Sequence, residues 1–475
     1  MSRSIFRLPG IVAAAGALAS CAALPADEPP RPLAQSESLA AKISFSAHER
    51  EWPGDGWWRA YGDPQLDQLI AEALAGSPDV AEARARAEKA EALASQAGAA
   101  MAPSLEAYGS ANENKQSYNY GIPPLFVPHG YHGYGAAALN LRYQLDLWGE
   151  NRAALAAETS EARAAKADAA EARLILSTEV AAAYADLERL WAERDVAERA
   201  VQSRTETLDL VTRRVANGLD TQGELDQARA GPAAARADLA AIDEQVVLGR
   251  NLVAALLGQG PDRGLAIAKP TAPTLQPFGL PARISVDLVG RRPDLAAARW
   301  RAEAAAKRIH QAQAKFYPNV NLAAYIGYQS LGLSKLFDSG SDVGQAGSAV
   351  TLPIFEGGRL RAGLWGARAD YSYAVAAYDK TLVQAVREAA DAAASERALA
   401  TRLRESAAAL DASEGAYRIA RLRYEGGLAN YQSVLLAEDA VLQNRRLVAD
   451  LRARALTLDI QLVRALGGGF IATKT

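Results

Sequence analysis

The sequence SPDV at residues 77–80 recurs as RPDL at residues 292–295, at an offset of 293 − 78 = 215 residues. Further along the chain the offset becomes 427 − 218 = 209, which pairs Gly218 with Gly427. A period of about 210 residues is far longer than the repeat of a solenoid protein. The pattern therefore predicts a duplicated unit of domain size, and we expect its two copies to share one architecture.

The duplication divides the chain into five predicted parts. These are a signal peptide (1–20), a lipidated linker (21–58), a first repeat (59–258), a linker or equatorial segment (259–284) and a second repeat (285–475). Within each repeat the sequence predicts the same order of elements: helix, strand, loop, strand, long helix, turn and long helix.

Alternation of apolar and polar residues predicts the strands. Residues 137–147 read AALNLRYQLDL, in which Leu139, Leu141 and Leu145 alternate with polar residues. Such a period of two gives a strand one apolar and one polar face. The other predicted strands are residues 105–111, 320–329 and 346–354.

Four strands of about ten residues suit an outer-membrane β-barrel, in which one face of each strand meets lipid and the other meets the lumen. Four strands cannot close a barrel alone, because the smallest single-chain barrels need about eight. Strands from several copies of the chain must therefore combine; the alternative is a soluble sheet with one wet face. The residues predicted to line a channel lumen are Asn140, Arg142, Gln144, Asp146, Asn319 and Asn321.

Two very long helices are predicted at residues 152–215 and 361–425, which lack proline and are rich in good helix formers. Helices of this length extend roughly 100 Å, at about 1.5 Å per residue. Gly218 and Gly427 follow their ends, where glycine commonly stops a helix. The other predicted helices are residues 64–75, 78–100, 224–257, 293–316 and 431–466.

The N-terminus carries the pattern of a secretory signal. An apolar stretch at residues 8–18 leads into LASC at residues 18–21. Small residues before a cysteine resemble the bacterial lipoprotein cleavage box. That resemblance implies that Cys21, the only cysteine in 475 residues, carries diacylglycerol and an N-palmitate. Ala22, in place of an aspartate, favours the outer membrane. The alternative is an ordinary signal peptide with a chance cysteine.

Composition and motifs exclude several functions. A formal net charge of −3 gives no basic patch of the kind that binds nucleic acid. No phosphate-binding Gly-Lys-Ser/Thr loop and no nucleophile elbow occurs in the sequence. His129 and His132 lie three residues apart among glycine and proline, where chance explains the pair better than a metal site. We therefore predict that the chain is not an enzyme and that it holds no metal and no cofactor.

Several short motifs are shared with a known family. They are WW at 57–58, YGDP at 61–64, LDLWG at 145–149, RPDL at 292–295, FYP at 316–318, LPIFEGG at 352–358 and ALGGG at 465–469. With these motifs the chain resembles the outer-membrane factors of the TolC superfamily, specifically the NodT-type lipoproteins of tripartite efflux systems. The resemblance covers roughly the whole mature chain.

The resemblance implies a mostly α fold and a homotrimer. Four strands from each subunit would make a twelve-stranded transmembrane β-barrel, continued by a long periplasmic α-helical barrel. The implied function is an outer-membrane channel, extending into the periplasm, that passively conducts substrates delivered by an RND-type inner-membrane pump and a periplasmic adaptor (membrane fusion) protein. The channel of a type I protein secretion system is one alternative. A periplasmic coiled-coil structural or adaptor lipoprotein and a surface adhesin are others.

The resemblance also assigns the turns between the long helices. The family's tip motif, Tyr-x-x-Gly followed by Val-Leu-x-Ala, matches Tyr424, Gly427 and residues 434–437. In relatives such turns meet the adaptor and close the periplasmic aperture. Relatives often carry arginine and aspartate where this chain has Glu425 and Leu436, so we predict closure by apolar contact of three leucines. The predicted docking and gate residues are Gly218, Leu219, Tyr424, Gly427, Leu428 and Leu436.

Overall fold

The structure, a computed structural model, describes residues 31–35, 39–41, 43–119, 121–271, 275, 278–281 and 284–472. The predicted signal peptide and Cys21 lie outside these residues. The chain divides into two compact units, which we describe separately. Among the described residues, the sheet unit lies within 31–33, 88–164 and 298–377, and the helical unit lies within 34–87, 165–297 and 378–472.

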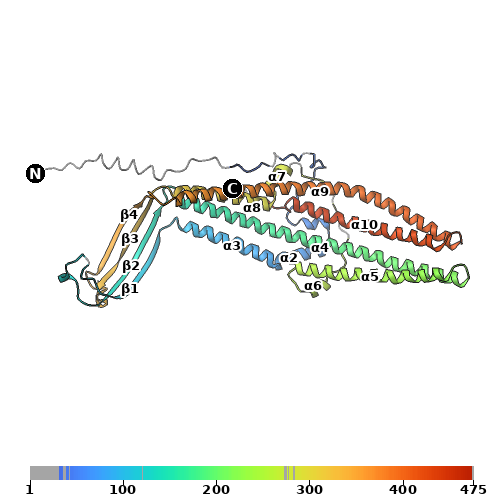
Figure 1. The fold of residues 1–475 in the computed structure, drawn as a ribbon, viewed down its shortest axis with the longest axis horizontal. Coiled ribbons are helices and arrows are strands. Elements are labelled where there is room, and N and C mark those ends of the chain that lie inside the picture. The colour runs from blue at the N-terminus through green and yellow to red at the C-terminus, as the bar shows by residue number, and fades with distance from the viewer. Residues whose placement is uncertain are drawn as a thin grey trace. The chain divides into compact units, whose positions relative to one another are not determined.

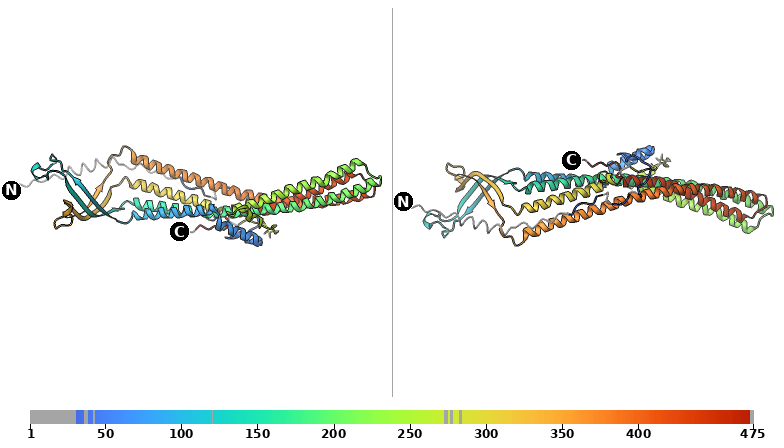
Figure 2. Two further views of the ribbon diagram at one scale, coloured as in Figure 1. Left: turned by 90° about the horizontal axis from the view of Figure 1, so that it is seen from below. Right: turned by 90° about the horizontal axis from the view of Figure 1, so that it is seen from above.

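Both repeats contain the predicted order of elements (Figures 1 and 2). The first repeat contains η2 (Trp57–Tyr61), α2 (Pro64–Gly76), α3 (Pro78–Ala99), β1 (Ser104–Asn114), η3 (Pro124–Phe126), β2 (His132–Leu145), α4 (Glu150–Ala216) and α5 (Gln222–Leu256). After α6 (Pro261–Leu265), the second repeat contains α7 (Ile284–Arg291), α8 (Pro293–Ala314), β3 (Asn319–Leu331), η4 (Leu333–Lys335), β4 (Asp342–Thr351), α9 (Arg359–Glu425) and α10 (Tyr431–Ala465). None of the helices in the described part of the chain has both the length and the apolar character needed to cross a membrane.

Side-chain caps explain where the helices of the helical unit begin. The carboxylate of Asp63 accepts hydrogen bonds from the backbone N–H groups at the start of α2, and Pro64 fixes the first helical residue. Thr221 and Glu224 form a capping box at the start of α5. Asn430 accepts a 3.1 Å hydrogen bond from the third residue of the next helix, α10. The turns between the long helices are therefore closed by their own side chains.

The four strands form one antiparallel sheet in the order β1-β2-β3-β4. Leu141 lies opposite Leu105 on one side and Ala324 on the other. Residues directly opposite one another share a face of the sheet. The register therefore gathers the apolar positions of neighbouring strands on one face, as the alternation predicts.

Two predicted strand ends are wrong. β2 ends at Leu145 instead of residue 147, because Asp146 turns to cap the start of α4. β4 ends at Thr351 instead of residue 354, because Pro353 has no N–H group to donate to a strand ladder. The strand β1, whose pattern is weak, is longer than predicted because it pairs with β2 along its whole length.

The core of the helical unit joins α2, α4 and α5. Ile70, Val180, Leu187 and Val253 are each 0% exposed within it. The chain before α2 is fastened to α10 by Asp459, which accepts hydrogen bonds from the Tyr61 hydroxyl (2.8 Å) and from Arg50 (2.9 Å). Within this unit α5 runs beside α4 and α10 beside α9, each pair joined by a short turn (Figure 1).

Candidate functional site

The two turns between the long helices have the same backbone. Gly218 and Gly427 adopt φ angles of 72° and 73°, in the left-handed region that glycine occupies without strain. The N–H of Leu219 donates to the carbonyl of Arg214 (2.9 Å) and the N–H of Leu428 to that of Arg423 (2.7 Å). Both are Schellman motifs, in which a left-handed residue ends the helix. The prediction that these glycines end the helices is confirmed.

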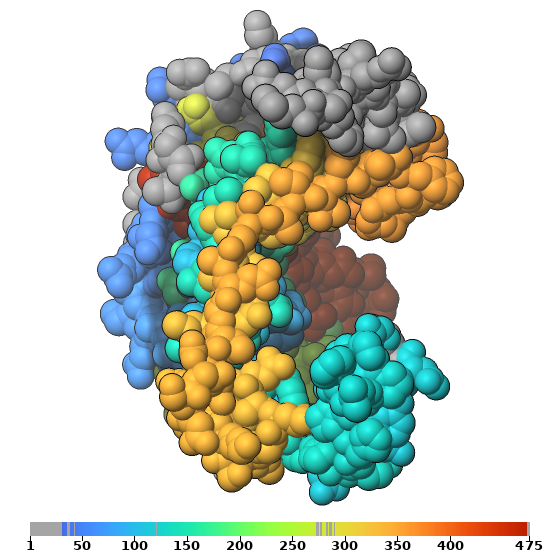
Figure 3. Space-filling view, turned by 90° about the vertical axis from the view of Figure 1, so that its left-hand side faces the viewer, coloured from blue at the N-terminus to red at the C-terminus, as the bar shows by residue number. Residues whose placement is uncertain are grey.

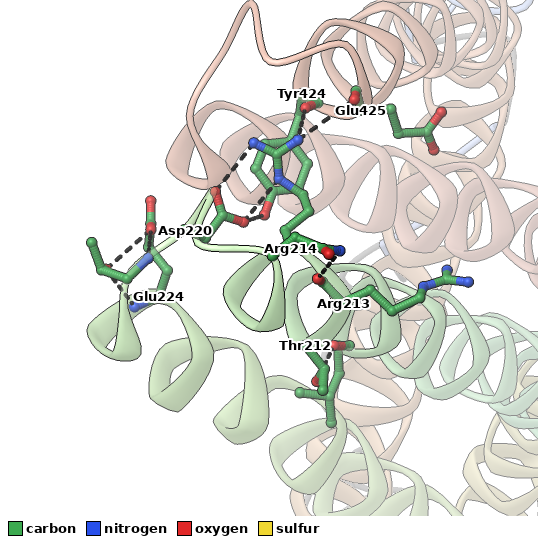
Figure 4. Close-up of polar contacts among 10 residues, drawn as sticks. Thr212, Arg213, Arg214, Asp220, Glu224, Tyr424 and Glu425 are labelled. Atoms are coloured by element: carbon green, nitrogen blue, oxygen red, sulfur yellow. Dashed lines mark hydrogen bonds and ion pairs between the residues drawn. The ribbon is translucent and has the colours of Figure 1, made fainter.

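Three side chains interlock the turn of the first repeat with the end of α9. The Arg214 guanidinium donates to both carboxylate oxygens of Asp220, at 3.0 and 3.2 Å, and to the backbone carbonyl of Tyr424 at 2.8 Å (Figure 4). The same guanidinium lies 4.4 Å from the centre of the Tyr424 ring. The Tyr424 hydroxyl donates to Asp220. We call Arg214, Asp220 and Tyr424 the tip clasp.

The tip clasp is largely shielded from solvent. The side chains of Arg214 and Asp220 are 12% and 6% exposed, and Tyr424 is 0% exposed. Burial and the hydrogen bond to Asp220 raise the pKa of the Tyr424 phenol, so it remains a proton donor. Buried charge-assisted hydrogen bonds are costly to break, because each abandoned partner stays without water. Tyr424 therefore fixes the tip from the inside and offers no side-chain surface of its own.

The first turn supplies the arginine and the aspartate of the tip clasp, and the second supplies the tyrosine. The exchanged arrangement does not occur in the sequence. At the offset of 209, the positions of Arg214 and Asp220 correspond to Arg423 and Ala429, and that of Tyr424 to Val215. Among the described residues, the Arg423 side chain makes one long contact of 3.5 Å, to the carbonyl of Leu428. Comparison of the two repeats could have indicated Asp220 as a functional residue, because it is charged where the second repeat has Ala429. Sequence reasoning missed both Arg214 and Asp220.

Three predicted tip residues are on the surface. Leu219, Leu428 and Leu436 are 64%, 73% and 62% exposed. Such exposure of large apolar side chains at helix turns is typical of a surface that meets another protein. Glu425 is held by Arg421 at 3.0 Å on the same helix. Docking and closure through these residues stay predictions.

A second polar link joins α4, α9 and α10 near the turns. The Ser203 hydroxyl donates to the carboxylate of Glu438 at 2.6 Å and lies 3.0 Å from the Tyr417 hydroxyl. Glu438 is 3% exposed, and burial raises its pKa. The sequence does not distinguish this glutamate from the solvated carboxylates of the same helices.

The strand register brings most of the predicted lumen residues together. Arg142 lies opposite Ala323, Gln144 opposite Asn321, and the remaining pairs follow in step. Five predicted residues therefore share the polar face of the sheet: Asn140, Arg142, Gln144, Asn319 and Asn321.

Asp146, the sixth predicted residue, lies beyond the end of β2. Its carboxylate accepts hydrogen bonds from the backbone N–H groups of Asn151 (3.1 Å) and Arg152 (3.0 Å). Burial opposes ionisation, but these hydrogen bonds prevail and lower the pKa of Asp146. This side chain therefore caps α4.

His129, in the connection between β1 and β2, and His132, the first residue of β2, contact backbone groups. His129 Nδ1 lies 3.1 Å from the carbonyl of Val127, and His132 Nε2 lies 3.0 Å from the carbonyl of His129. The described residues contain no group of three or more His, Cys, Asp or Glu side chains arranged to hold a metal ion.

Comparison with known proteins matches this geometry to one class. A family model described as "Outer membrane efflux protein" matches residues 69–259 and 285–468. The multidrug resistance outer membrane protein MdtP of Escherichia coli is 32% identical over 469 residues, covering 96% of this chain and 94% of that protein. The fusaric acid resistance protein FusA of Burkholderia cepacia is 37% identical over 360 residues, covering 74% of this chain and 67% of that protein.

A solved structure supports the same class. The crystal structure of the outer membrane protein VceC from Vibrio cholerae superposes with a TM-score of 0.84 at 47% sequence identity, covering 88% of this chain and 100% of that chain. A duplicated strand-pair and helix-pair unit with these relatives defines an outer-membrane channel. The chain belongs to the outer membrane efflux protein family. It acts in the outer membrane as the exit duct of an efflux system.

Proposed function

We propose that the chain forms a homotrimer whose sheets close a single twelve-stranded β-barrel. The observation that carries this proposal is the sheet itself, in which β1 and β4 are the outer strands of the described part of the chain. An open strand edge in lipid leaves backbone groups unsatisfied, at several kcal/mol each. Pairing β4 of one subunit with β1 of the next removes both edges, and the helical units then continue as an α-helical barrel in the periplasm.

The polar face of the sheet lines the lumen of this barrel, and the apolar face meets lipid. Arg142 and the asparagine and glutamine residues beside it give the lumen a polar surface, and Glu106, which lies opposite Asn140 on the same face, supplies the opposite charge. Large apolar residues of the other face, including Leu105 and Ile326, are 65% and 69% exposed in the isolated chain. Lipid removes that apolar surface from water, which supports this orientation of the sheet.

The helix turns are the site of partner docking and closure. A periplasmic adaptor meets the exposed leucines of the turns, Leu219 and Leu428, and an RND-type inner-membrane pump supplies the substrate. Three copies of Leu436 close the aperture by apolar contact. The tip clasp holds each subunit's own pair of turns together beneath this surface. The relatives' names, which refer to multidrug and fusaric acid resistance, support export of small toxic molecules.

Cys21 anchors the mature protein to the outer membrane through diacylglycerol and N-palmitate. The cleavage-box pattern before the cysteine supports the anchor. Radioactive palmitate should label the wild-type protein and not the Cys21→Ser variant. Labelling of both proteins would contradict the anchor without affecting the channel.

Membrane fractions run on SDS gels with and without boiling test the trimer. We expect a species of trimer size that collapses to monomer on heating, and the purified species should conduct ions in a planar bilayer. A heat-insensitive monomer without conductance would contradict the proposal. Leu436→Ala should increase the resting conductance of the trimer and the leakage of large antibiotics in cells. Unchanged conductance would show that Leu436 does not close the aperture.

A further inference from the structure

A small pocket lies in the sheet unit where β4 leads into α9. It has a volume of about 150 Å³, and Phe316, Ile354, Phe355, Leu360 and Arg361 are among the residues that line it. Sites that bury a whole drug-sized ligand have volumes of about 300–1,000 Å³, so this pocket has room for only part of a larger molecule. In Figure 3 the orange segment that joins β4 to α9 lies at the surface.

Two aromatic side chains, Phe316 and Phe355, line this pocket. Phe355 is 86% exposed although it carries a large apolar ring. Tyr317, next to Phe316, stacks on Trp148 with ring centres 4.7 Å apart, and the Trp148 indole N–H donates to the carbonyl of Pro318 at 2.8 Å. Trp148 and Tyr317 remain 51% and 42% exposed. The indole N–H of Trp148 is satisfied by the backbone while both aromatic side chains stay partly exposed, which is typical of side chains at a membrane–water interface.

The three connections that carry these residues leave the same end of the antiparallel sheet. β2 ends before Trp148, β3 begins after Tyr317, and β4 ends before Phe355. Val350, Leu352 and Ile354 follow one another at every second residue and are 66%, 45% and 43% exposed. Exposed apolar surface therefore continues from β4 into the pocket.

One positive charge lies at the pocket without a counterpart. Arg361 is exposed, and its guanidinium makes no hydrogen bond or ion pair with any residue that the structure describes. The neighbouring Arg359 is paired with Glu356. A guanidinium with free N–H groups binds the oxygens of a phosphate well, because it can donate two parallel hydrogen bonds.

We propose that this pocket binds a glycerophospholipid of the inner leaflet, with its phosphate on Arg361 and the upper part of one acyl chain against Phe355 and Ile354. The inference rests on the proposed barrel, because lipid reaches this end of the sheet only when the apolar face is in the membrane. It assigns a specific lipid contact to each subunit. A lipid held here fixes the height of the barrel in the membrane at the point where strands give way to helices.

Binding of phosphatidylglycerol to the purified, delipidated full-length trimer tests the headgroup contact. Native mass spectrometry should show one tightly bound phosphatidylglycerol per subunit. Loss of a charge-assisted hydrogen bond in Arg361→Ala should weaken binding about tenfold. Arg361→Lys should retain most of it. Arg402→Ala removes an exposed arginine of the same helix outside the pocket and should bind as the wild type does. Equal binding by the wild type and Arg361→Ala would overturn the proposal.

A fluorescent reporter in the pocket tests the acyl-chain contact. Phe355→Trp, reconstituted into vesicles with brominated phosphatidylglycerol, should lose part of its added fluorescence, because bromine quenches an excited indole only at contact. Leu422→Trp, at an exposed position near the turns, should not be quenched. An unquenched reporter at residue 355 would show that a second copy of the chain, and not lipid, covers the pocket.

Conductance measured on the same preparations separates this inference from the proposed function. A conducting trimer without selective lipid binding overturns the lipid site and leaves the channel intact. A protein that forms no trimer and does not conduct overturns both.

Discussion

The two helix turns of the protein share a backbone and differ in their side chains. Both end in a left-handed glycine with a Schellman motif, at Gly218 and Gly427. The first turn contributes Arg214 and Asp220 to the tip clasp, and the second contributes Tyr424. The two repeats have therefore kept the same turn geometry. Each residue of the tip clasp, however, belongs to only one of the two repeats.

This difference has a consequence for the proposed trimer. Each turn there has two neighbours, one within its own subunit and one in the next subunit. The clasp occupies the contact within the subunit. At the contact with the next subunit, the equivalent residues are Arg423, Ala429 and Val215. These residues provide neither the carboxylate nor the phenol of the clasp. We therefore expect the ring of turns to separate between subunits before it separates within one.

The largest effect is expected where a left-handed glycine is also tightly packed. Gly467 ends α10 with φ 86°, and a Cβ there would lie 2.0 Å from the carbonyl oxygen of Arg291. Gly467→Ala should destabilise the protein by about 3 kcal/mol, from left-handed strain together with the clash. Gly218→Ala is the matched control, because no atom lies within 4 Å of its Cβ position, and about 1 kcal/mol is expected. The midpoint temperature of trimer dissociation on gels measures both, and equal effects would contradict the argument.

Removal of the clasp arginine should have the next largest effect. Arg214→Ala leaves the buried Asp220 carboxylate and the Tyr424 carbonyl without their donor, at a cost of about 2 kcal/mol per subunit. We expect greater resting conductance and greater uptake of large antibiotics. Arg423→Ala removes the equivalent arginine of the second turn, whose single contact is 3.5 Å long, and should change neither. If the two variants leak equally, the asymmetry has no role in closure.

Loss of the clasp hydroxyl alone should have a smaller effect. Tyr424→Phe keeps the ring beneath the Arg214 guanidinium and removes the hydrogen bond to Asp220. A hydrogen bond from a hydroxyl to a buried carboxylate contributes about 1.5 kcal/mol, less than the loss of the whole Arg214 side chain, so the conductance should fall between those of the wild type and Arg214→Ala. A double-mutant cycle of Tyr424→Phe with Asp220→Asn measures the coupling directly. Strictly additive effects would show that the two side chains do not act together.

Local patterns predicted much of this architecture from the sequence. Glycine after a proline-free run located both helix turns, because a left-handed stop needs no distant partner. Alternation located the strands and placed Asn140 and Asn321 on the same face before the pairing was known. Asp146 fits the same alternation, but its carboxylate caps α4. The backbone N–H groups at the start of that helix donate hydrogen bonds to the carboxylate, and the alternation pattern contains no signal for them.

The tip clasp could not be predicted in the same way. Asp220 and Tyr424 are separated by 204 residues, and Arg214 and Tyr424 by 210. No periodicity of either helix requires these side chains to meet. Their contact depends on how the two helix pairs pack, so only the departure of Asp220 from Ala429 between the copies gives a sequence signal.

The comparison extends to one buried glutamate near the turns. Glu438 of α10 corresponds to Arg229 of α5, since 438 − 229 = 209. Glu438 is 3% exposed, whereas Arg229 is exposed and pairs with Asp226 at 3.0 Å. Burial raises the pKa of Glu438, against the opposing effects of the Ser203 hydrogen bond and the positive charge of Arg204. Asp439 acts in the same direction as burial, and Arg421 of α9 opposes it.

Glu438→Gln should therefore produce the smallest effect, and one that depends on pH. The folded-state pKa lies above the unfolded value of 4.5, so the folded protein binds the extra proton between these two values. Stability from this group is complete below the unfolded pKa and is lost as the pH rises through the folded pKa. The glutamine variant lacks this loss, so its trimer dissociation temperature relative to the wild type should rise as the pH is raised above the unfolded value of 4.5. Arg229→Gln should give a constant difference over the same range. Parallel curves for Glu438→Gln and the wild type would show that the carboxyl titrates normally and that its burial carries no electrostatic cost.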